Sequence, residues 1–191
     1  PRPNAPEIVA NLLQPSIRFA REDCIDLPHT TFVTRHAPLT ADQQKAYKDM
    51  LNNLKVEMAQ GQVLAVNEAV KLMKLVQIAT GVLYNDNGEE LEIAAEPRIE
   101  LVKEIIEQAG AKTIVFVPFK GALRYAASQL EKDFTVACVS GEVSKSARDE
   151  IFHHFQRSKH PQVLGAQPAA MSHGLTLTEA NTIVWFAPIT S

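Results

Sequence analysis

The chain has 191 residues, 46% of them hydrophobic and 6% aromatic, so it is long enough to bury the core of one domain with an appendage. Its formal net charge of −3 excludes a polycation that would grip nucleic acid through overall charge. No apolar run approaches the ~20 residues that span a bilayer, and the N-terminus lacks the layout of a signal peptide. We therefore expect a cytoplasmic protein with no membrane partner.

Charge is unevenly distributed along the chain. Residues 81–110 carry eight acidic and two basic side chains, whereas residues 111–160 carry five acidic and eight basic ones. The second segment is therefore suited to face phosphates. The alternative is that these charges lie on ordinary solvated helix faces.

Two helices are predicted in the first half of the chain. The segment 39–60 begins with Thr40 and Gln43 in capping-box spacing. It then places apolar residues on one helical face, which predicts a single long amphipathic helix; these residues are Tyr47, Met50, Leu51, Leu54 and Met58. A second helix is predicted over residues 66–81, with Gly81 as its C-cap.

Two β elements flank these helices. Residues 30–38 (TTFVTRHAP) are predicted to form a short strand. Residues 82–93 place Asn87-Gly88 between two alternating runs, which favours a hairpin. Because this hairpin is acidic, we expect it to be a surface excursion that points away from nucleic acid.

From residue 97 onward helices and apolar strands alternate. Strands of near-uniform apolarity between helices predict an α/β fold with a parallel sheet covered on both faces, a three-layer domain whose ligands gather at the carboxyl ends of the strands. The predicted helices are 96–110, 121–133 and 144–157, and the predicted strands are 112–119, 134–141, 162–167 and 182–188.

Several kinds of site are absent from the sequence. No glycine pattern fits a dinucleotide-binding loop, and no Gly-Lys-Ser/Thr forms a P-loop. The pair Cys24 and Cys138 suits reduced thiols and not a disulfide framework. His153, His154 and His160 lack a further ligand, so we predict no metal site and no catalytic residue in this chain.

Three strand-end segments, in this order, resemble the second RecA-like lobe of superfamily 2 helicases, especially the Swi/Snf-type translocases and their short bacteriophage members. TIVFVPFKGALRYAASQL resembles motif IV, VSGEVSKSARDEIFHHF resembles the Ser-Gly helix that follows it, and QPAAMSHGLTLTEANTIVWFAP resembles motif V. Upstream, LLQPSIRFAREDCIDLPHTTFVTRHAPLTADQQKAY resembles the segment that joins the two lobes.

The resemblance implies a RecA-like domain and a division of the chain. Residues 1–96 would hold the inter-lobe linker, a helical extension and the hairpin, and residues 97–191 the lobe core, truncated before motif VI. The partners implied are DNA and the first RecA-like lobe of the same polypeptide, in the host cytoplasm if a phage encodes it. ATP and Mg would be cofactors of the full-length protein; the fragment alone is expected to bind neither and to be inactive.

The motif V resemblance assigns roles to the loop before the last strand. Ser172, His173 and Thr176 are expected to contact nucleic acid, and Gly174 and Leu175 to couple these contacts to the ATP site. The alternative is a simple strand-to-helix turn in which the hydrogen-bonding groups of His173 are already paired within the protein. The family usually has a Gly-Gly pair where this chain has Met171-Ser172, so the detailed backbone contacts differ.

The other two segments supply further candidate contacts with nucleic acid, namely Phe119, Lys120, Arg124, Ser140 and Gly141. The alternative is that the two cations are only solvated. Arg148 is expected to brace the Ser140-Gly141 loop. The competing function is an α/β nucleotide- or protein-binding module without motor activity.

Overall fold

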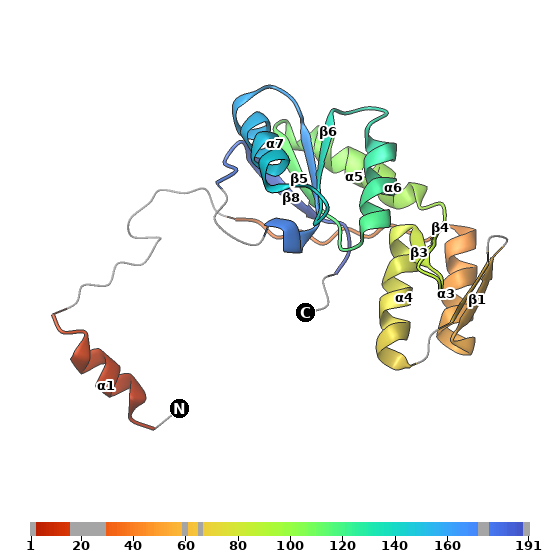
Figure 1. Cartoon of the computed structure of the whole chain (residues 1–191), viewed down its shortest axis with the longest axis horizontal. Coiled ribbons are helices and arrows are strands. Elements are labelled where there is room, and N and C mark those ends of the chain that lie inside the picture. The colour runs from red at the N-terminus through yellow and green to blue at the C-terminus, as the bar shows by residue number, and fades with distance from the viewer. Residues whose placement is uncertain (1–2, 16–29, 59–60, 65–66, 172–175, 189–191) are drawn as a thin grey trace. The chain divides into compact units, whose positions relative to one another are not determined.

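The structure is a computed structural model that describes residues 3–15, 30–58, 61–64, 67–171 and 176–188 (Figure 1). The chain divides into two compact units, Pro1–His36 and Ala37–Ser191, which we describe separately. Among the described residues, no helix combines the length and apolarity that crossing a membrane requires.

The first unit contains helix α1 (Ala5–Leu12), which has no buried residue. The strand predicted over residues 30–38 is wrong, because these residues form neither strand nor helix. A strand needs a hydrogen-bonding neighbour and a buried face, and here Phe32 and Val33 are 92% and 65% exposed. The sequence pattern of residues 30–38 alone was therefore not enough to predict a strand.

In the second unit, the predicted parallel sheet is confirmed. It has four strands in the order β6-β7-β5-β8, and each neighbouring pair is parallel. The strands are β5 (Lys112–Phe116), β6 (Val136–Val139), β7 (Val163–Ala166) and β8 (Ala180–Trp185). Helix α5 (Glu96–Ala109) precedes β5, α6 (Lys120–Leu130) connects β5 to β6, and α7 (Lys145–Arg157) connects β6 to β7.

Helices cover both faces of this sheet, as Figure 1 shows. On one face, Val115 and Val163 pack in a core with Val102 of α5 and Leu123 of α6. On the other face, the side chains of β5, β6 and β7 pack against α7; this second core contains Ile114, Val139, Leu164, Phe152 and Phe155. The alternation of side chains along each strand therefore gives the predicted three layers.

The helix predicted over residues 39–60 is partly wrong. Helix α3 (Ala41–Asn53) begins with the predicted capping box at Thr40, but it ends where Leu54 adopts a left-handed φ of 55°. The chain then forms β1 (Lys55–Met58), which pairs antiparallel with β2 (Gly61–Leu64). Val56 and Val63 face each other and are buried, so β-branched side chains with a period of two replace the helical period here.

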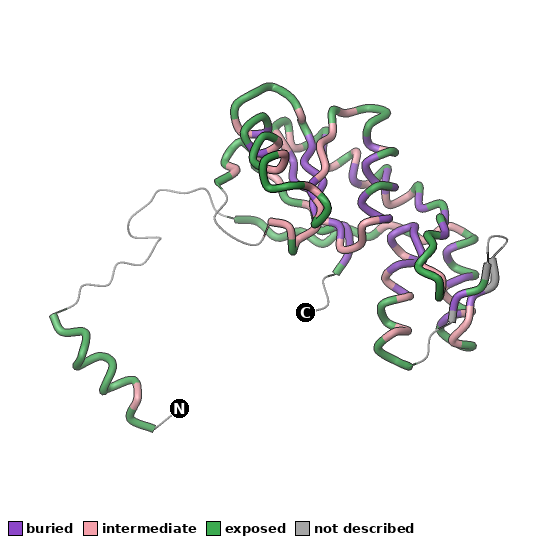
Figure 2. The backbone as a smooth tube through the Cα atoms, viewed as in Figure 1, coloured by how far each residue is buried: buried purple, intermediate pink, exposed green. Residues whose placement is uncertain are grey.

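Helix α4 (Glu68–Thr80) is confirmed, and Gly81 ends it with a φ of 90°. The hairpin β3 (Val82–Tyr84) and β4 (Glu90–Glu92) is also confirmed, with Leu83 opposite Leu91. It is not a surface excursion, however. Leu83 and Leu91 are buried in a core with α3 and α4, whereas Glu90, Glu92 and the turn between the strands are exposed (Figure 2).

Candidate nucleic-acid interface

The candidate site lies at the carboxyl edge of the parallel sheet. Because the strands are parallel, the segments that follow β5, β6, β7 and β8 all emerge at this edge. Helices α6 and α7 begin a few residues after β5 and β6, so their N-termini also lie there. The partial positive charge of helix N-termini makes such an edge favourable for anions.

The first turn of α6 is held by the β3–β4 hairpin. Phe119 is the N-cap residue of α6 and makes no side-chain capping hydrogen bond; its ring packs against the main core. Instead, the backbone N–H of Gly121 donates to the hydroxyl of Tyr84, with an N–O distance of 2.8 Å. Burial raises the pKa of Tyr84, and the nearby Glu90 carboxylate adds to this effect.

Lys120 is paired with an acidic residue from the next loop. Its ammonium nitrogen lies 2.6 Å from an oxygen of Glu142, which follows β6. The two side chains are 43% and 63% exposed. The hydrogen bond from Lys120 lowers the pKa of Glu142.

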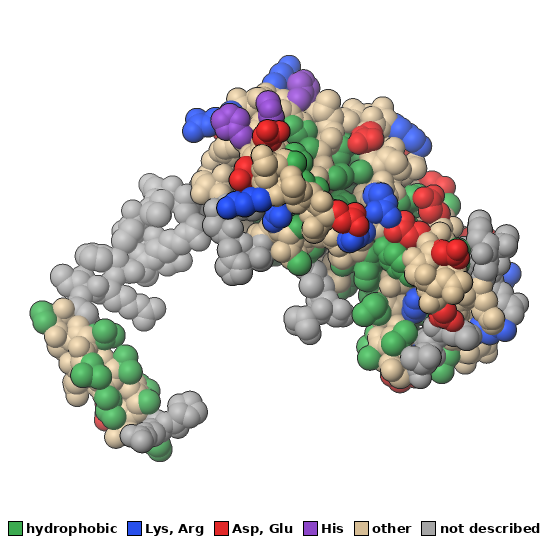
Figure 3. Space-filling view, viewed as in Figure 1, with side chains coloured by type: hydrophobic (Ala, Val, Ile, Leu, Met, Phe, Trp, Pro, Cys, Tyr) green, Lys and Arg blue, Asp and Glu red, His purple; other side chains and the backbone are tan. Residues whose placement is uncertain are grey.

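Arg124 lies one helical turn after Lys120 and is paired with the hairpin. Its guanidinium is 2.5 Å from a carboxylate oxygen of Glu90, and the two side chains are 60% and 30% exposed. This hydrogen bond raises the pKa of Arg124. On the face shown in Figure 3, basic and acidic side chains accordingly lie next to one another.

Ser140 and Gly141 lie in the loop between β6 and α7, and Gln167 connects this loop to its neighbours. The backbone N–H of Gly141 donates to the Gln167 side chain over 3.4 Å, and the amide of Gln167 donates to the carbonyl of Pro118 over 3.4 Å. Sequence reasoning missed Gln167, although a polar residue directly after a buried strand was the available signal.

The bracing role predicted for Arg148 is confirmed. Its guanidinium donates to the carbonyl of Val143 over 3.4 Å and to the carbonyl of Ala170 over 3.1 Å. Its Nε is buried and has no hydrogen-bond partner among the residues that the structure describes. Arg148 therefore ties the β6–α7 loop to the 3-10 helix η1 (Pro168–Met171) that follows β7.

A second arginine of this kind was not predicted. Arg98, near the start of α5, donates to the carbonyl of Phe186 over 2.6 Å and lies 5.5 Å from the centre of the Phe186 ring. Burial lowers the pKa of Arg98. This residue fixes the end of β8 to α5, and no local sequence signal announces a bond across 88 residues.

Most of the motif V loop falls outside the described residues, namely Ser172, His173, Gly174 and Leu175. Thr176 is described and is exposed. The structure therefore gathers the other predicted contacts at one edge of the sheet; these are Phe119, Lys120, Arg124, Ser140 and Gly141.

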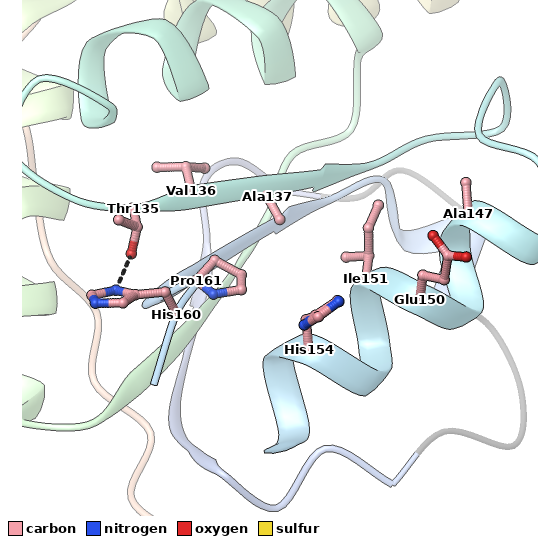
Figure 4. Close-up of a pocket in the computed structure, with 9 residues that line it drawn as sticks. All are labelled: Thr135, Val136, Ala137, Ala147, Glu150, Ile151, His154, His160 and Pro161. Atoms are coloured by element: carbon pink, nitrogen blue, oxygen red, sulfur yellow. Dashed lines mark hydrogen bonds between the residues drawn. The ribbon is translucent and has the colours of Figure 1, made fainter. Parts of the chain in front are cut away.

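The cavities in the described part of the second unit include two that can be compared with the predicted contacts. One of about 220 Å³ is at the carboxyl edge and is lined by Phe119, Gln167 and Pro188, together with Met73 and Val76 of α4. The other, of about 500 Å³, lies between β6 and α7 (Figure 4). None of the predicted contact residues lines the second cavity.

Two of the histidines, His154 and His160, line the larger cavity. The Nδ1 of His160 lies 2.9 Å from the hydroxyl oxygen of Thr135. Within the described ranges, no group of three or more His, Cys, Asp or Glu side chains is placed to hold a metal ion. Burial raises the pKa of the Cys138 thiol to about 11, so this cysteine is a poor nucleophile near neutral pH.

Comparison with known proteins agrees with this architecture. Residues 97–191 match the family of the helicase conserved C-terminal domain. The chain is 26% identical over 164 residues to protein p41 of Acyrthosiphon pisum secondary endosymbiont phage 1, a match that covers 86% of this chain and 34% of the phage protein. The chain thus spans about a third of that relative's length.

Solved structures show the same fold. The C-terminal domain of the Sulfolobus solfataricus SWI2/SNF2 ATPase superposes with a TM-score of 0.58 at 26% identity, over 78% of this chain and 68% of that one. The core of that ATPase in complex with dsDNA gives a TM-score of 0.58 at 24% identity, over 78% and 33%. The C-terminal part of the Fun30 ATPase domain gives 0.54 at 14% identity, over 80% and 73%. Residues 97–191 therefore belong to the family of helicase C-terminal domains, and the chain as a whole is similar in fold to the C-terminal domains of SWI2/SNF2 ATPases.

Proposed function

We propose that this chain is the second motor lobe of an ATP-dependent DNA helicase or translocase. In this role the carboxyl edge of the sheet contacts phosphates of the nucleic acid and completes an ATP site together with a first lobe. Residues 1–96 then provide the inter-lobe linker, the helical extension and the hairpin, and residues 97–191 provide the lobe core. The proposed place of action is the cytoplasm, that of the host cell if a phage encodes the protein.

The observation that carries this proposal is a pair of partly exposed cations at the N-terminus of α6, Lys120 and Arg124. Lys120 and Arg124 are four residues apart, so their side chains lie on the same face of the helix. This face lies at the edge where the positive ends of α6 and α7 meet. DNA is the nucleic acid favoured, because the core of the related Sulfolobus ATPase has been solved with dsDNA.

The described residues do not fit a complete site for ATP and Mg. The sequence has no Gly-Lys-Ser/Thr loop, and the described part of the chain has no cluster of carboxylates placed to hold a cation. In the proposed function the first lobe therefore holds most of the nucleotide and metal. The contribution expected from this chain is the loop of Gly174 and Leu175, which the structure does not describe.

The proposal is tested by titrating a fluorescein-labelled DNA duplex with the 191-residue chain at several salt concentrations. Binding should weaken as salt rises, because each cation that contacts a phosphate releases a counterion. The double variant Lys120→Ala/Arg124→Ala should bind roughly three- to tenfold more weakly. Its plot of log affinity against log salt should flatten by about 0.7–0.9 for each phosphate that is no longer neutralised.

A matched control removes the same charge elsewhere. Lys132 follows the C-terminal end of α6, and Arg157 is the last residue of α7. Both positions are away from the carboxyl edge. Lys132→Ala/Arg157→Ala should bind DNA with nearly the wild-type salt slope. If both double variants lose affinity equally, the motor-lobe interface is wrong and the binding-module alternative gains support.

A further inference from the structure

In the free protein, each cation of the proposed interface forms an ion pair with a carboxylate. Lys120 is paired with Glu142 at 2.6 Å, and Arg124 with Glu90 at 2.5 Å. These acidic residues come from different elements, the β6–α7 loop and strand β4, and they reach α6 from two sides. The α6 face is therefore locally neutral and not basic.

The hairpin places the backbone of Glu90 beside α6. Tyr84, which lies opposite Glu90 in the hairpin, accepts the hydrogen bond from the Gly121 backbone. Gly121 is so close to the hairpin that a Cβ built there would lie 2.7 Å from Glu90 and 2.8 Å from the buried Val82. The backbone of Glu90 is thus placed beside α6 by the packing of the hairpin, while its partly exposed carboxylate is held by the ion pair with Arg124.

Carboxylate and phosphate oxygens accept the same hydrogen bonds from lysine and arginine. Resting on the function proposed above, we infer that Glu90 and Glu142 are internal competitors for phosphate and determine how readily this face accepts nucleic acid. They hold Lys120 and Arg124 in place before the ligand arrives, and they must be displaced when phosphate oxygens take over these hydrogen bonds. A single small anion replaces the carboxylate of only one cation, whereas a nucleic acid replaces the carboxylates of both cations together.

This inference predicts that removal of either carboxylate tightens DNA binding. Glu142→Gln and Glu90→Gln keep the side-chain shape and remove the charge. Because an exposed ion pair is weak, each change should raise the affinity for the labelled duplex about two- to fivefold, and the double change should combine the two gains. The loss caused by Lys120→Ala should be larger in the Glu142→Gln background than in the wild type.

Glu107→Gln is the matched control, because it makes the same change of net charge at an exposed position near the end of α5. It measures the effect of overall charge alone. If Glu142→Gln and Glu90→Gln tighten binding no more than Glu107→Gln, while the wild type binds with the expected salt dependence, competition by the carboxylates is refuted and the proposed function stands. Binding that appears only in Glu90→Gln/Glu142→Gln supports the inference. Failure of this double variant to bind overturns both the inference and the proposed function.

Discussion

The carboxyl edge of the sheet contains two kinds of cation. Arg98 and Arg148 are partly buried and donate to backbone carbonyls, those of Phe186 and Ala170 being distant in sequence. Lys120 and Arg124 are 43% and 60% exposed and donate to carboxylates. At this edge the residue type therefore does not indicate whether a cation stabilises the fold or is available to a ligand. The hydrogen-bond partner of each cation does indicate this.

The difference has a physical basis. A backbone carbonyl bonded to a partly buried guanidinium cannot exchange its partner for water without cost, so such an arginine stabilises the fold. An exposed ion pair contributes little to stability because water competes for both charges. A ligand phosphate can therefore replace the carboxylate of Lys120 or Arg124, but it cannot recruit Arg148 without disconnecting two loops.

The largest effect that tests this comparison is expected for Arg148→Ala. The change leaves the carbonyls of Val143 and Ala170 without their charged donor, so the free energy of unfolding should fall by about 2–3 kcal/mol. Arg124→Ala, the control at an exposed cation, should cost less than about 1 kcal/mol. Urea denaturation measures both values. Equal costs for the two variants would contradict the division into structural and exchangeable cations.

A smaller effect is expected where the hairpin touches α6. Gly121→Ala places a methyl group 2.8 Å from a methyl carbon of Val82 and 2.7 Å from Glu90. Overpacking of about 1–3 kcal/mol, partly offset by the better helix propensity of alanine, should lower the free energy of unfolding by about 1–2 kcal/mol. Because Glu90 must move, DNA binding should also tighten, as in Glu90→Gln.

Gly141→Ala is the control for this prediction. Nothing lies within 4 Å of a Cβ built at Gly141, so the change should leave the stability within about 0.5 kcal/mol of the wild type. Thermal unfolding followed by circular dichroism separates the two glycines. A Gly121→Ala protein as stable as Gly141→Ala would show that the hairpin is not packed tightly on α6.

The sheet was predictable because its signals are local. Apolar runs alternate with amphipathic helices at regular spacing after residue 97, and the parallel pairing follows from that alternation. The segment 39–60 was harder because Met50 and Val56 are both buried, one in a helix and the other in a strand. The switch occurs at Leu54, a left-handed residue that a helical pattern does not reveal.

The site was only partly predictable for a related reason. The positions of Phe119, Lys120 and Arg124 follow from the strand-to-helix junction, which is local in sequence. The partners of the two cations are not local, since Glu90 is 34 residues from Arg124 and Glu142 is 22 residues from Lys120. The acidic charge of the hairpin predicted that the hairpin lies away from nucleic acid. Folding instead brings the hairpin against α6, the helix that we propose to bind nucleic acid.

The smallest effect concerns the titration of Glu142. The hydrogen bond from Lys120 lowers the pKa of this carboxyl group in the folded protein. The pair is therefore intact at neutral pH and is lost as the pH falls through the folded pKa of Glu142, where the carboxyl becomes neutral and releases Lys120. A carbon-13 NMR titration of the Glu142 carboxyl should give a lower midpoint in the wild type than in Lys120→Met. Equal midpoints for Glu142 would mean that the Lys120–Glu142 pair is not maintained in solution, and Glu142 could not then compete with phosphate for that cation.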